Sequence, residues 1–378
     1  MFKTIKFFEG LNGLRFIAAY LVVIHHAEQI RLKYGLFNLK QFTVFNNGGI
    51  AVTFFFVLSG FLITYLLLKE ETKTGDISVR NFYIRRVLRI WPLYYLLVLI
   101  GTVLLPFILE FFNYNYQMPY TFGETIGYFV FFMPFVVNIL YGTHLLDPLW
   151  SIGVEEIYYL MWAPLTKFFK KYFLQLIIAI FIIKVIIMAF SYLGYFNDVA
   201  RQIIGLLKFE AMAIGAFGAY YIYYTEKPIE SRWFFSNAIQ FAVFSFLVSK
   251  FLLQSFLIEH IPQFTILFTT PIFSELLLMA AFCWIIISVS LNPKSFVKLN
   301  NKYLDYLGDI SYGIYMYHMI TIFAIVLFLK NFLNGLPNSV STILFYIIVT
   351  FFVILISAIS KSIFENKFLK LKKKFERV

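Results

Sequence analysis

One uncharged run of sequence decides the fold class: Gly48-Gly-Ile-Ala-Val-Thr-Phe-Phe-Phe-Val-Leu-Ser-Gly-Phe-Leu-Ile-Thr-Tyr-Leu-Leu-Leu68. A helix needs about 20 mostly apolar residues to cross the hydrocarbon core of a bilayer. This run meets that length, and its polar side chains are all hydroxyls. It therefore predicts a membrane-spanning helix.

Similar apolar runs recur along the whole chain. With the first, they are Leu11–Ile30, Gly48–Leu68, Phe82–Pro106, Leu149–Phe168, Phe173–Leu193, Ile203–Tyr224, Phe234–Leu257, Phe264–Val289, Leu307–Leu329 and Ser341–Ile363. Of the 378 residues, 61% are hydrophobic and 14% are charged, whereas soluble domains contain about 25% charged residues. This composition excludes a soluble globular protein. We predict an all-α, polytopic integral membrane protein with about ten transmembrane helices.

One further apolar run, Ile126–Tyr141, is short and contains Pro134. If it crossed the bilayer, every later loop rich in lysine and arginine would move to the outside, against the positive-inside rule. We therefore predict that residues 107–148 form an outer segment with a re-entrant or surface helix. Both termini are then expected to be cytoplasmic.

The excess of basic residues also bears on the partners of the protein. The net charge is +12, which in a membrane protein indicates cytoplasmic loops and contacts with anionic lipid headgroups rather than nucleic acid. The basic tail at 364–378 is expected to bind such headgroups. We expect a single transmembrane domain over residues 1–378, in the inner (cytoplasmic) membrane of the cell. The sequence leaves the oligomeric state open.

Ionisable residues inside predicted spans are costly and are therefore candidates for function. Arg15 and His26 share one face of the first helix, about 16 Å apart along its axis, whereas His25 points to another face. Arginine suits an anion such as a phosphate, and histidine suits proton transfer. The pair indicates an anionic donor entering from inside, with proton chemistry deeper in the membrane. The alternative is that His26 caps the helix and Arg15 extends to the headgroups.

A basic cluster precedes the third span, where Arg85, Arg86 and Arg89 occupy neighbouring helical positions. Residues three and four apart lie on one helix face, so these guanidinium groups are suited to clamping a phosphate. An ordinary positive-inside anchor is the alternative.

Two adjacent acids, Glu155 and Glu156, lie in the apolar stretch that begins at Leu149. Two adjacent buried carboxylates do not both ionise cheaply, so at least one needs a partner or a proton. One of them could orient and stabilise a catalytic histidine, as in a triad. A structural salt bridge to an arginine is the alternative.

Ser59 and Gly60 in the second span permit close approach of a ligand or, more simply, of another helix. His318 ends a tyrosine-rich stretch and is interpreted as a packing residue. Other charged residues in or near the spans have no predicted role beyond pairing: Lys184, Lys208, Glu210, Lys250 and Glu275. The sequence contains no recognisable metal-binding, nucleotide-binding or serine-hydrolase motif.

Taken in order, five segments resemble the acyltransferase-3 family of bacterial integral-membrane acyltransferases, which O-acetylate cell-surface glycans. They are Leu11-Asn-Gly-Leu-Arg-Phe-Ile-Ala-Ala, Phe55-Phe-Val-Leu-Ser-Gly-Phe-Leu-Ile-Thr, Arg85-Arg-Val-Leu-Arg-Ile-Trp-Pro-Leu-Tyr, Leu149-Trp-Ser-Ile-Gly-Val-Glu-Glu and Ile310-Ser-Tyr-Gly-Ile-Tyr-Met-Tyr-His. The resemblance covers essentially the whole chain and implies ten core spans with an acyl-CoA donor on the cytoplasmic side.

The family's motifs fall on residues already singled out. The resemblance places its arginine–histidine pattern on Arg15 and His26, its basic motif on Arg85, Arg86 and Arg89, and its acidic motif on Trp150, Ser151, Glu155 and Glu156. The chain departs from the family at Asn12, where many members have Asp, at Gly153, where many have Ser, and at Ile157-Tyr158-Tyr159, where many have Gln-Phe-Tyr.

We therefore expect an O-acyltransferase that moves an acyl group, most simply acetyl, from acyl-CoA to a hydroxyl of a cell-surface or lipid-linked glycan. The expected catalytic residues are His26, Glu156, Glu155 and Arg15. The expected donor-binding residues are Arg85, Arg86, Arg89, Ser59, Gly60 and Phe61. No metal or permanently bound cofactor is expected. The alternatives are a transporter or flippase for a glycan, lipid or small molecule, and a lipid-carrier glycosyltransferase.

Overall fold

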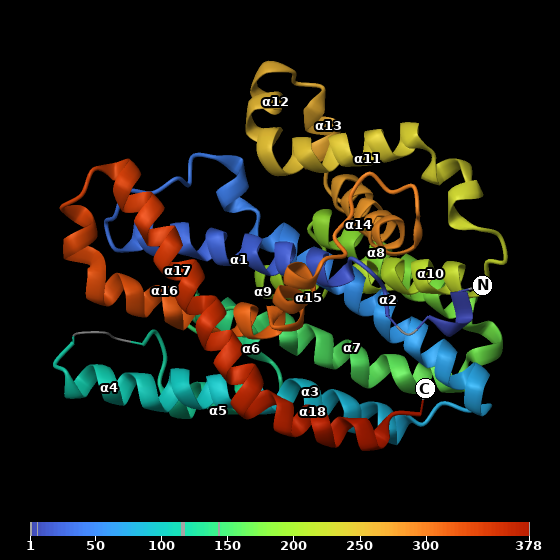
Figure 1. Ribbon diagram of the computed structural model, residues 1–378, viewed down its shortest axis with the longest axis horizontal. Coiled ribbons are helices and arrows are strands. Elements are labelled where there is room, and N and C mark those ends of the chain that lie inside the picture. Colours follow the sequence, from blue (N-terminus) through green and yellow to red (C-terminus); the bar gives the residue numbers. More distant parts are fainter. Residues whose placement is uncertain (1, 6, 115–117, 143, 378) are drawn as a thin grey trace.

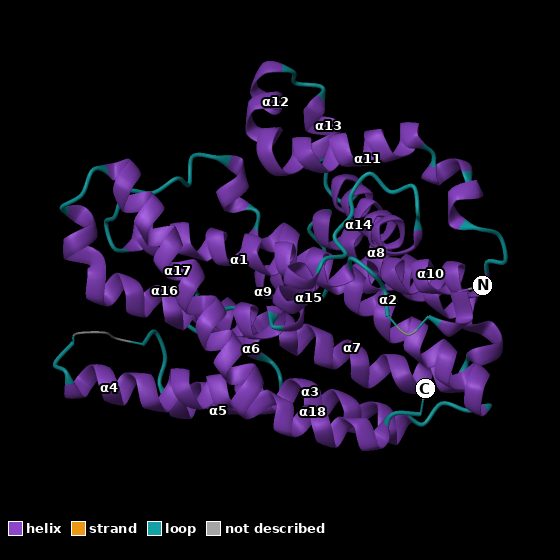
Figure 2. Cartoon of the chain, in the orientation of Figure 1, coloured by secondary structure: helices purple, strands orange, loops and turns teal. Residues whose placement is uncertain are grey.

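The computed structural model describes residues 2–5, 7–114, 118–142 and 144–377, and these residues form helices and loops with no strand (Figure 2). Eight helical runs among them are long and apolar enough to span a membrane. Two more helices, α1 (Leu11–Lys33) and α7 (Leu149–Phe168), have spanning length but carry several charged residues. The prediction of an all-α, polytopic membrane protein is confirmed.

The eight apolar runs contain the other long helices. They are α2 (Gly48–Thr74), α3 (Val79–Leu99) with α4 (Leu105–Phe111), α8 (Phe173–Tyr192), α9 (Asp198–Leu206) with α10 (Phe209–Tyr224), α11 (Asn237–Val248) with α12 (Gln254–His260), α14 (Phe273–Leu291), α16 (Ser311–Asn334), and α17 (Asn338–Ser360) with α18 (Asn366–Lys372). The remaining helices are short: α5 (Phe122–Val130), α6 (Pro134–Tyr141), α13 (Phe264–Thr269) and α15 (Lys302–Asp309).

Three predicted spans contain a break near their beginning. The span predicted from Ile203 is divided between the end of α9 at Leu206 and the start of α10 at Phe209. The span predicted from Phe264 contains a break after α13, where Pro271 lacks a backbone N–H and Ile272 has a φ of 63°, so α14 starts only at Phe273. The span predicted from Leu307 is likewise divided, because α15 ends at Asp309 and α16 starts at Ser311.

The centre of the bundle is α2, which packs against α1, α7, α10 and α14. Its closest neighbour is α10, and glycines on both helices permit the approach. A Cβ atom added at Gly60 would lie 2.0 Å from the Met212 carbonyl oxygen, and one added at Gly215 would lie 1.9 Å from the Val57 carbonyl oxygen. Small residues at such crossings let two helix backbones pack closely in a membrane.

The periphery of the bundle is apolar as well as the core. On α8 and α11, Ile183 is 57% exposed and Phe241 is 70% exposed. Figure 1 shows α11 at the edge of the molecule. Apolar side chains that no protein atom covers suit contact with lipid tails.

The two ends of the described chain lie near the same end of α2. Tyr65 Oη donates a hydrogen bond to the Phe2 carbonyl oxygen (2.7 Å), and Arg377 forms an ion pair with Glu70 (3.1 Å). Figure 1 shows the N and C labels at the same side of the bundle. Between α4 and α7, the described residues include only the short helices α5 and α6, each well below the length needed to cross a bilayer.

Candidate active site

A cavity of about 290 Å³ lies among α1, α2, α3, α7 and α16. We call it the arginine cavity. Its polar lining residues are Asn12, Arg15, Ser59, Tyr65, Arg86, Arg89, Ser151, Glu155, Tyr159, Ser311, Tyr312 and Tyr315. Five predicted site residues from four separate segments of the chain therefore meet here: Arg15, Ser59, Arg86, Arg89 and Glu155.

Positive charge dominates this cavity, because three arginines face one glutamate. The guanidinium group of Arg86 lies 5.5 Å from the ring centroid of Phe82 and 5.6 Å from that of Tyr159. Its Nε has no hydrogen-bond acceptor among the described residues. A guanidinium group held between aromatic rings with a free donor is suited to binding an anionic ligand.

Glu155 is held by two hydroxyl groups rather than by a histidine. Ser59 Oγ donates to one carboxylate oxygen (2.9 Å) and Tyr159 Oη to the other (2.8 Å). Glu156 lies outside the cavity lining and accepts a hydrogen bond from Trp91 Nε1 (3.0 Å). Neither carboxylate pairs with His26 in the described structure, so the expectation that one of them orients His26 is wrong. The two carboxylates have different partners because consecutive residues of α7 point in different directions.

His26 instead pairs with a second intramembrane histidine. His26 Nδ1 lies 2.9 Å from His318 Nε2, and His318 Nδ1 lies 2.6 Å from the Tyr315 carbonyl oxygen. On its other side, His26 Nε2 lies 3.8 Å from a carboxylate oxygen of Asp147. Asn138 in α6 donates to both the side chain and the carbonyl of Asp147, which holds this carboxylate in place.

These contacts assign the tautomers of the two histidines. A carbonyl oxygen only accepts, so His318 Nδ1 carries the proton and Nε2 of neutral His318 is an acceptor. His26 Nδ1–H therefore donates to His318, which leaves a lone pair on His26 Nε2. The Asp147 carboxylate beside that nitrogen would stabilise the imidazolium formed when Nε2 takes up a proton.

Tyr315 connects the two parts of the site. Its side chain lines the arginine cavity, and its hydroxyl contacts Ser151 Oγ (2.7 Å) and the Pro148 carbonyl oxygen (3.0 Å). Its own carbonyl oxygen binds His318. His26 itself does not line the cavity, so the predicted base and the predicted anion-binding residues occupy adjoining places separated by this tyrosine.

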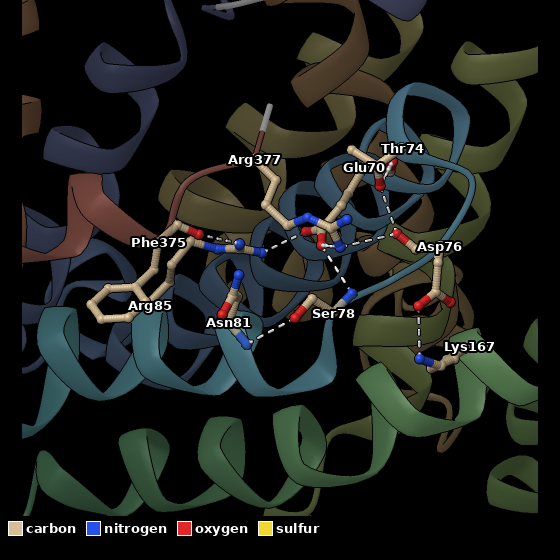
Figure 3. Close-up of polar contacts among 9 residues, drawn as sticks. All are labelled: Glu70, Thr74, Asp76, Ser78, Asn81, Arg85, Lys167, Phe375 and Arg377. Carbon is tan, nitrogen blue, oxygen red and sulfur yellow. Dashed lines mark hydrogen bonds and ion pairs between the residues drawn. The ribbon is translucent and has the colours of Figure 1, made fainter.

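Arg85 is not part of the cavity, contrary to prediction. It forms an ion pair with the fully buried Glu70 (2.8 Å) and donates to the Phe375 carbonyl oxygen (2.8 Å). Glu70 also pairs with Arg377 and accepts from the backbone N–H of Ser78 (2.9 Å). Figure 3 shows Arg85 and Arg377 on the Glu70 carboxylate. Arg85 therefore attaches the C-terminal tail to α2 and α3.

Gly60 and Phe61 are also outside the cavity lining. Gly60 lies against the α10 backbone, as the packing alternative proposed. Phe61 is fully buried, and its ring contacts that of Phe8 with centroids 5.3 Å apart. Their neighbour Ser59 points to the other side of α2 and lines the cavity, because successive helical residues differ by about 100° in direction.

Four of the five remaining charges form ion pairs, whereas Lys250 donates a hydrogen bond to the Phe268 carbonyl oxygen (2.7 Å). Lys184 lies 3.7 Å from Glu210, and Lys208 lies 2.6 Å from Glu275. Across the described residues, no group of three histidine, cysteine or acidic side chains is arranged to hold a metal ion. The ring nitrogens of His25 contact the Phe45 carbonyl oxygen and Gln29, each at 3.0 Å, and its ring lies edge-on to that of His26 with centroids 5.1 Å apart.

Two site residues escaped prediction from the sequence. His318 was interpreted as a packing residue, although an ionisable side chain inside a span is itself a signal of function. Asp147 lies just before the segment that begins at Leu149, in a stretch with no periodic pattern. Asp147 lies between α6 and α7, where Asn138 of α6 holds it, and only the tertiary structure brings it next to His26.

Comparison with known proteins agrees with this arrangement. The sequence profile described as an acyltransferase domain matches residues 8–361, a range that contains all the polar lining residues of the cavity and the histidine pair. The chain belongs to the acyltransferase-3 family. The resemblance noted from five sequence segments is thereby confirmed.

Relatives of this acyltransferase-3 chain include proteins that are O-acetyltransferases by name. It is 25% identical over 331 residues to the peptidoglycan O-acetyltransferase OatA of Listeria monocytogenes, covering 83% of this chain and 49% of that protein. It is 28% identical over 166 residues to the putative peptidoglycan O-acetyltransferase YrhL of Bacillus subtilis, covering 42% of this chain and 23% of that protein.

A shorter match has higher identity. A putative O-acetyltransferase of Staphylococcus aureus is 39% identical over 105 residues, which cover 28% of this chain and 15% of that protein. The chain spans about half the length of the Listeria relative. No solved structure matches the chain.

Proposed function

We propose that this protein is an O-acetyltransferase of the cytoplasmic membrane, which takes an acetyl group from acetyl-CoA and transfers it to a hydroxyl of a cell-envelope glycan. The observation that carries the proposal is the junction of a cavity lined by three arginines with a His26–His318 pair, through Tyr315. Membership of an acyltransferase family supports the reaction class, and the names of the relatives support a glycan acceptor.

The donor would enter at the basic end of the bundle. Arg86 and Arg89 would bind its phosphates, with Arg15 further along the same cavity, since all three line it. A volume of about 290 Å³ holds part of such a donor, and we assign it to the pantetheine arm with its thioester. The cavity lies at the basic end of the bundle. The positive-inside rule places basic ends in the cytoplasm, so a cytoplasmic donor is favoured.

The chemistry would take place at His26 Nε2. This nitrogen would remove the proton from the acceptor hydroxyl as the oxygen attacks the thioester carbonyl. The C–S bond then breaks, and the proton passes from His26 to the departing thiolate to release CoA. His318 would keep His26 in the required tautomer, and Asp147 would stabilise the transient imidazolium. Direct attack of Nε2 on the thioester, forming an acyl-histidine, is the other route.

The test uses purified protein in nanodiscs with radiolabelled acetyl-CoA, comparing wild type with His26→Ala and His25→Ala. We expect His26→Ala to lose acetyl-CoA turnover by about 10²- to 10⁴-fold, the usual contribution of a general base. His25→Ala is the control from the next position of α1, because both ring nitrogens of His25 are already bound, one to the Phe45 carbonyl oxygen and one to Gln29. Equal loss in both variants would remove His26 from its role, and failure of wild type to bind acetyl-CoA would overturn the proposed donor.

A further inference from the structure

A second, smaller cavity of about 50 Å³ lies near the other end of α1. We call it the small cavity. Its lining residues are Gln29, Ile30, Lys33, Tyr34, His144, Leu145, Met319 and Phe323. None of these residues lines the arginine cavity.

The two cavities lie along the same faces of the same two helices. On α1, Arg15 lines the arginine cavity and Lys33 lines the small cavity, and 18 residues correspond to about five complete helical turns and roughly 27 Å. His26 lies between them on this face. On α16, Tyr315 lines the first cavity and Met319, one turn further, lines the second, with His318 between. The histidine pair therefore separates the two cavities.

The small cavity contains a buried polar group without a partner. His144 is 3% exposed, and its Nδ1 accepts from the backbone N–H of Leu146 (3.1 Å) with Tyr120 Oη 3.2 Å away. Because Nδ1 is an acceptor, the proton of the neutral ring lies on Nε2. Nε2 has no hydrogen-bond partner among the described residues. A buried donor without an acceptor is costly, and such groups are normally satisfied by a ligand or by water.

We propose that the small cavity binds the acceptor beside the hydroxyl that reacts at His26, with His144 Nε2–H donating to an acceptor oxygen and Gln29 and Lys33 at its rim. This inference rests on the proposed function and names the matching subsite. The volume of about 50 Å³ has room for a hydroxyl-bearing group, since a cavity of roughly 10–15 Å³ already holds one water molecule. The cavity therefore fits one hydroxyl-bearing arm of the glycan acceptor proposed above. Donor and acceptor would meet at His26 from opposite ends of α1.

The first test fills the cavity. Met319→Trp adds volume to its lining, and Phe328→Trp is the control, because Phe328 lies on the same helix and is 81% exposed. The assay measures transfer of radiolabelled acetyl from acetyl-CoA to chitotetraose, and to water as hydrolysis, alongside acetyl-CoA binding. We expect Met319→Trp to lower both transfer rates at least about tenfold with unchanged acetyl-CoA affinity, and Phe328→Trp to change neither.

The second test isolates the His144 donor. His144→Asn keeps an oxygen near the position of Nδ1, which preserves the contact with Leu146, but withdraws the donor from the cavity. His144→Gln extends an amide toward the position of Nε2 and restores a donor. We expect His144→Asn to raise the KM for chitotetraose about tenfold and His144→Gln to recover most of that loss.

Each outcome decides the inference. Unchanged transfer in Met319→Trp and in His144→Asn would overturn the subsite while leaving the proposed function intact. Hydrolysis without glycan transfer in wild type would contradict the glycan acceptor, and the hydrolysis rate of Met319→Trp would still test the cavity. Absence of acetyl-CoA binding in wild type would overturn the proposed function and the subsite together. If Met319→Trp lost acetyl-CoA binding, its transfer rates would not test the small cavity. The KM values of the two His144 variants for chitotetraose would then decide whether the acceptor binds there.

Discussion

At the scale of single residues, the contact between His26 and His318 determines which nitrogen is free to act. His318 Nε2 is the acceptor for His26 Nδ1–H at 2.9 Å, so removing it would release the imidazole of His26 to rotate or to change tautomer. Two neighbouring intramembrane histidines are thereby given different roles. His26 would exchange protons, and His318 would position it.

We expect His318→Phe to lower kcat at least about tenfold without changing acetyl-CoA affinity, within the range that a misplaced base loses. His318→Gln, which offers an amide oxygen near the position of Nε2, should recover part of the rate. Steady-state kinetics and donor binding in nanodiscs measure both. Equal rates in the two variants would indicate that His318 only fills space.

The arginines of α3 lead to a second residue-scale prediction. Arg86 and Arg89 line the arginine cavity, whereas Arg80 on the same helix is exposed and outside it. We expect Arg86→Gln and Arg89→Gln each to weaken acetyl-CoA binding about tenfold, because a hydrogen bond to a charged group contributes roughly 1.5–3 kcal/mol. Arg80→Gln is the control, because it removes one positive charge from the same helix outside the cavity. A similar loss in all three variants would indicate a general surface potential instead.

His144 leads to a prediction about pH. Burial lowers the pKa of this histidine from 6.5 to about 4, partly offset by Asp147. The unfolded chain therefore binds a proton at higher pH than the folded chain does. The stability contributed by neutral His144 is complete above pH 6.5 and decreases as the pH falls toward 4, by at most about 1.4 kcal/mol per pH unit.

Unfolding of wild type and His144→Asn in detergent between pH 7.5 and 4.5 measures this contribution. We expect the stability of wild type to decrease more steeply with acidification than that of His144→Asn. Parallel curves would show that His144 is protonated equally in the folded and unfolded states.

At the scale of helices, the α2–α10 crossing determines the position of Ser59. Gly60 and Gly215 bring the two backbones into contact, with added Cβ atoms only 2.0 and 1.9 Å from carbonyl oxygens. This contact orients α2 so that the residue before Gly60 lines the cavity. A glycine outside the site thus decides which side chain enters it.

Gly60→Ala should therefore destabilise the protein by about 1–3 kcal/mol or more, the usual cost of overpacking. Gly127→Ala in α5 is the matched control, since a Cβ there meets nothing within 4 Å, and alanine is favoured over glycine in helices by about 1 kcal/mol. Thermal unfolding in one detergent compares them. A stable, fully active Gly60→Ala protein would contradict this account of the crossing.

The short helices before α7 also have a role at this scale. α6 does not have the length of a span, but Asn138 within it holds Asp147 beside His26. The segment between α4 and α7 thus contributes a carboxylate to the site, although it was predicted only as an outer segment.

At the scale of the whole molecule, the C-terminal tail returns to the beginning of the bundle. Glu70 is fully buried and binds Arg85 and Arg377 together, so two arginines 292 positions apart share one carboxylate. The neighbour of Arg85 is Arg86 of the arginine cavity. The tail therefore supports the helix that carries the predicted donor-binding arginines.

Removing the carboxylate and removing the terminal arginine should have different effects. Glu70→Ala leaves Arg85 without its buried partner and should cost about 3–5 kcal/mol of stability. Arg377→Ala should cost at most about 1 kcal/mol, because its side chain is 31% exposed and the pair is screened. It should nevertheless speed trypsin cleavage at Lys372–Lys374. Unfolding and limited proteolysis on the same samples distinguish the two variants. Equal losses of stability would contradict the larger role assigned to Glu70.

The sequence by itself determined the fold class, the approximate positions of the spans and the family. Long apolar runs permit only spanning helices in a bilayer, because every backbone polar group must be satisfied within the segment. The same physics identified the rare charges inside those runs as candidates, because burying a charge in lipid is costly unless the charge has a partner or a function. These charges are Arg15, His26, Glu155 and the α3 arginines.

Only the tertiary structure decided which of those residues meet. Helical periodicity gives the direction of a side chain around its own axis, but the partner on another helix depends on how the helices cross and rotate. Gly60 packs against α10, so Ser59 lines the cavity. Arg85 forms an ion pair with Glu70 and therefore lies outside the cavity. Helix packing also places His318 and Asp147 next to His26, although they are 292 and 121 positions away from it along the chain. Contacts between residues so far apart leave no pattern in the sequence, because close packing of side chains is a property of the assembled bundle.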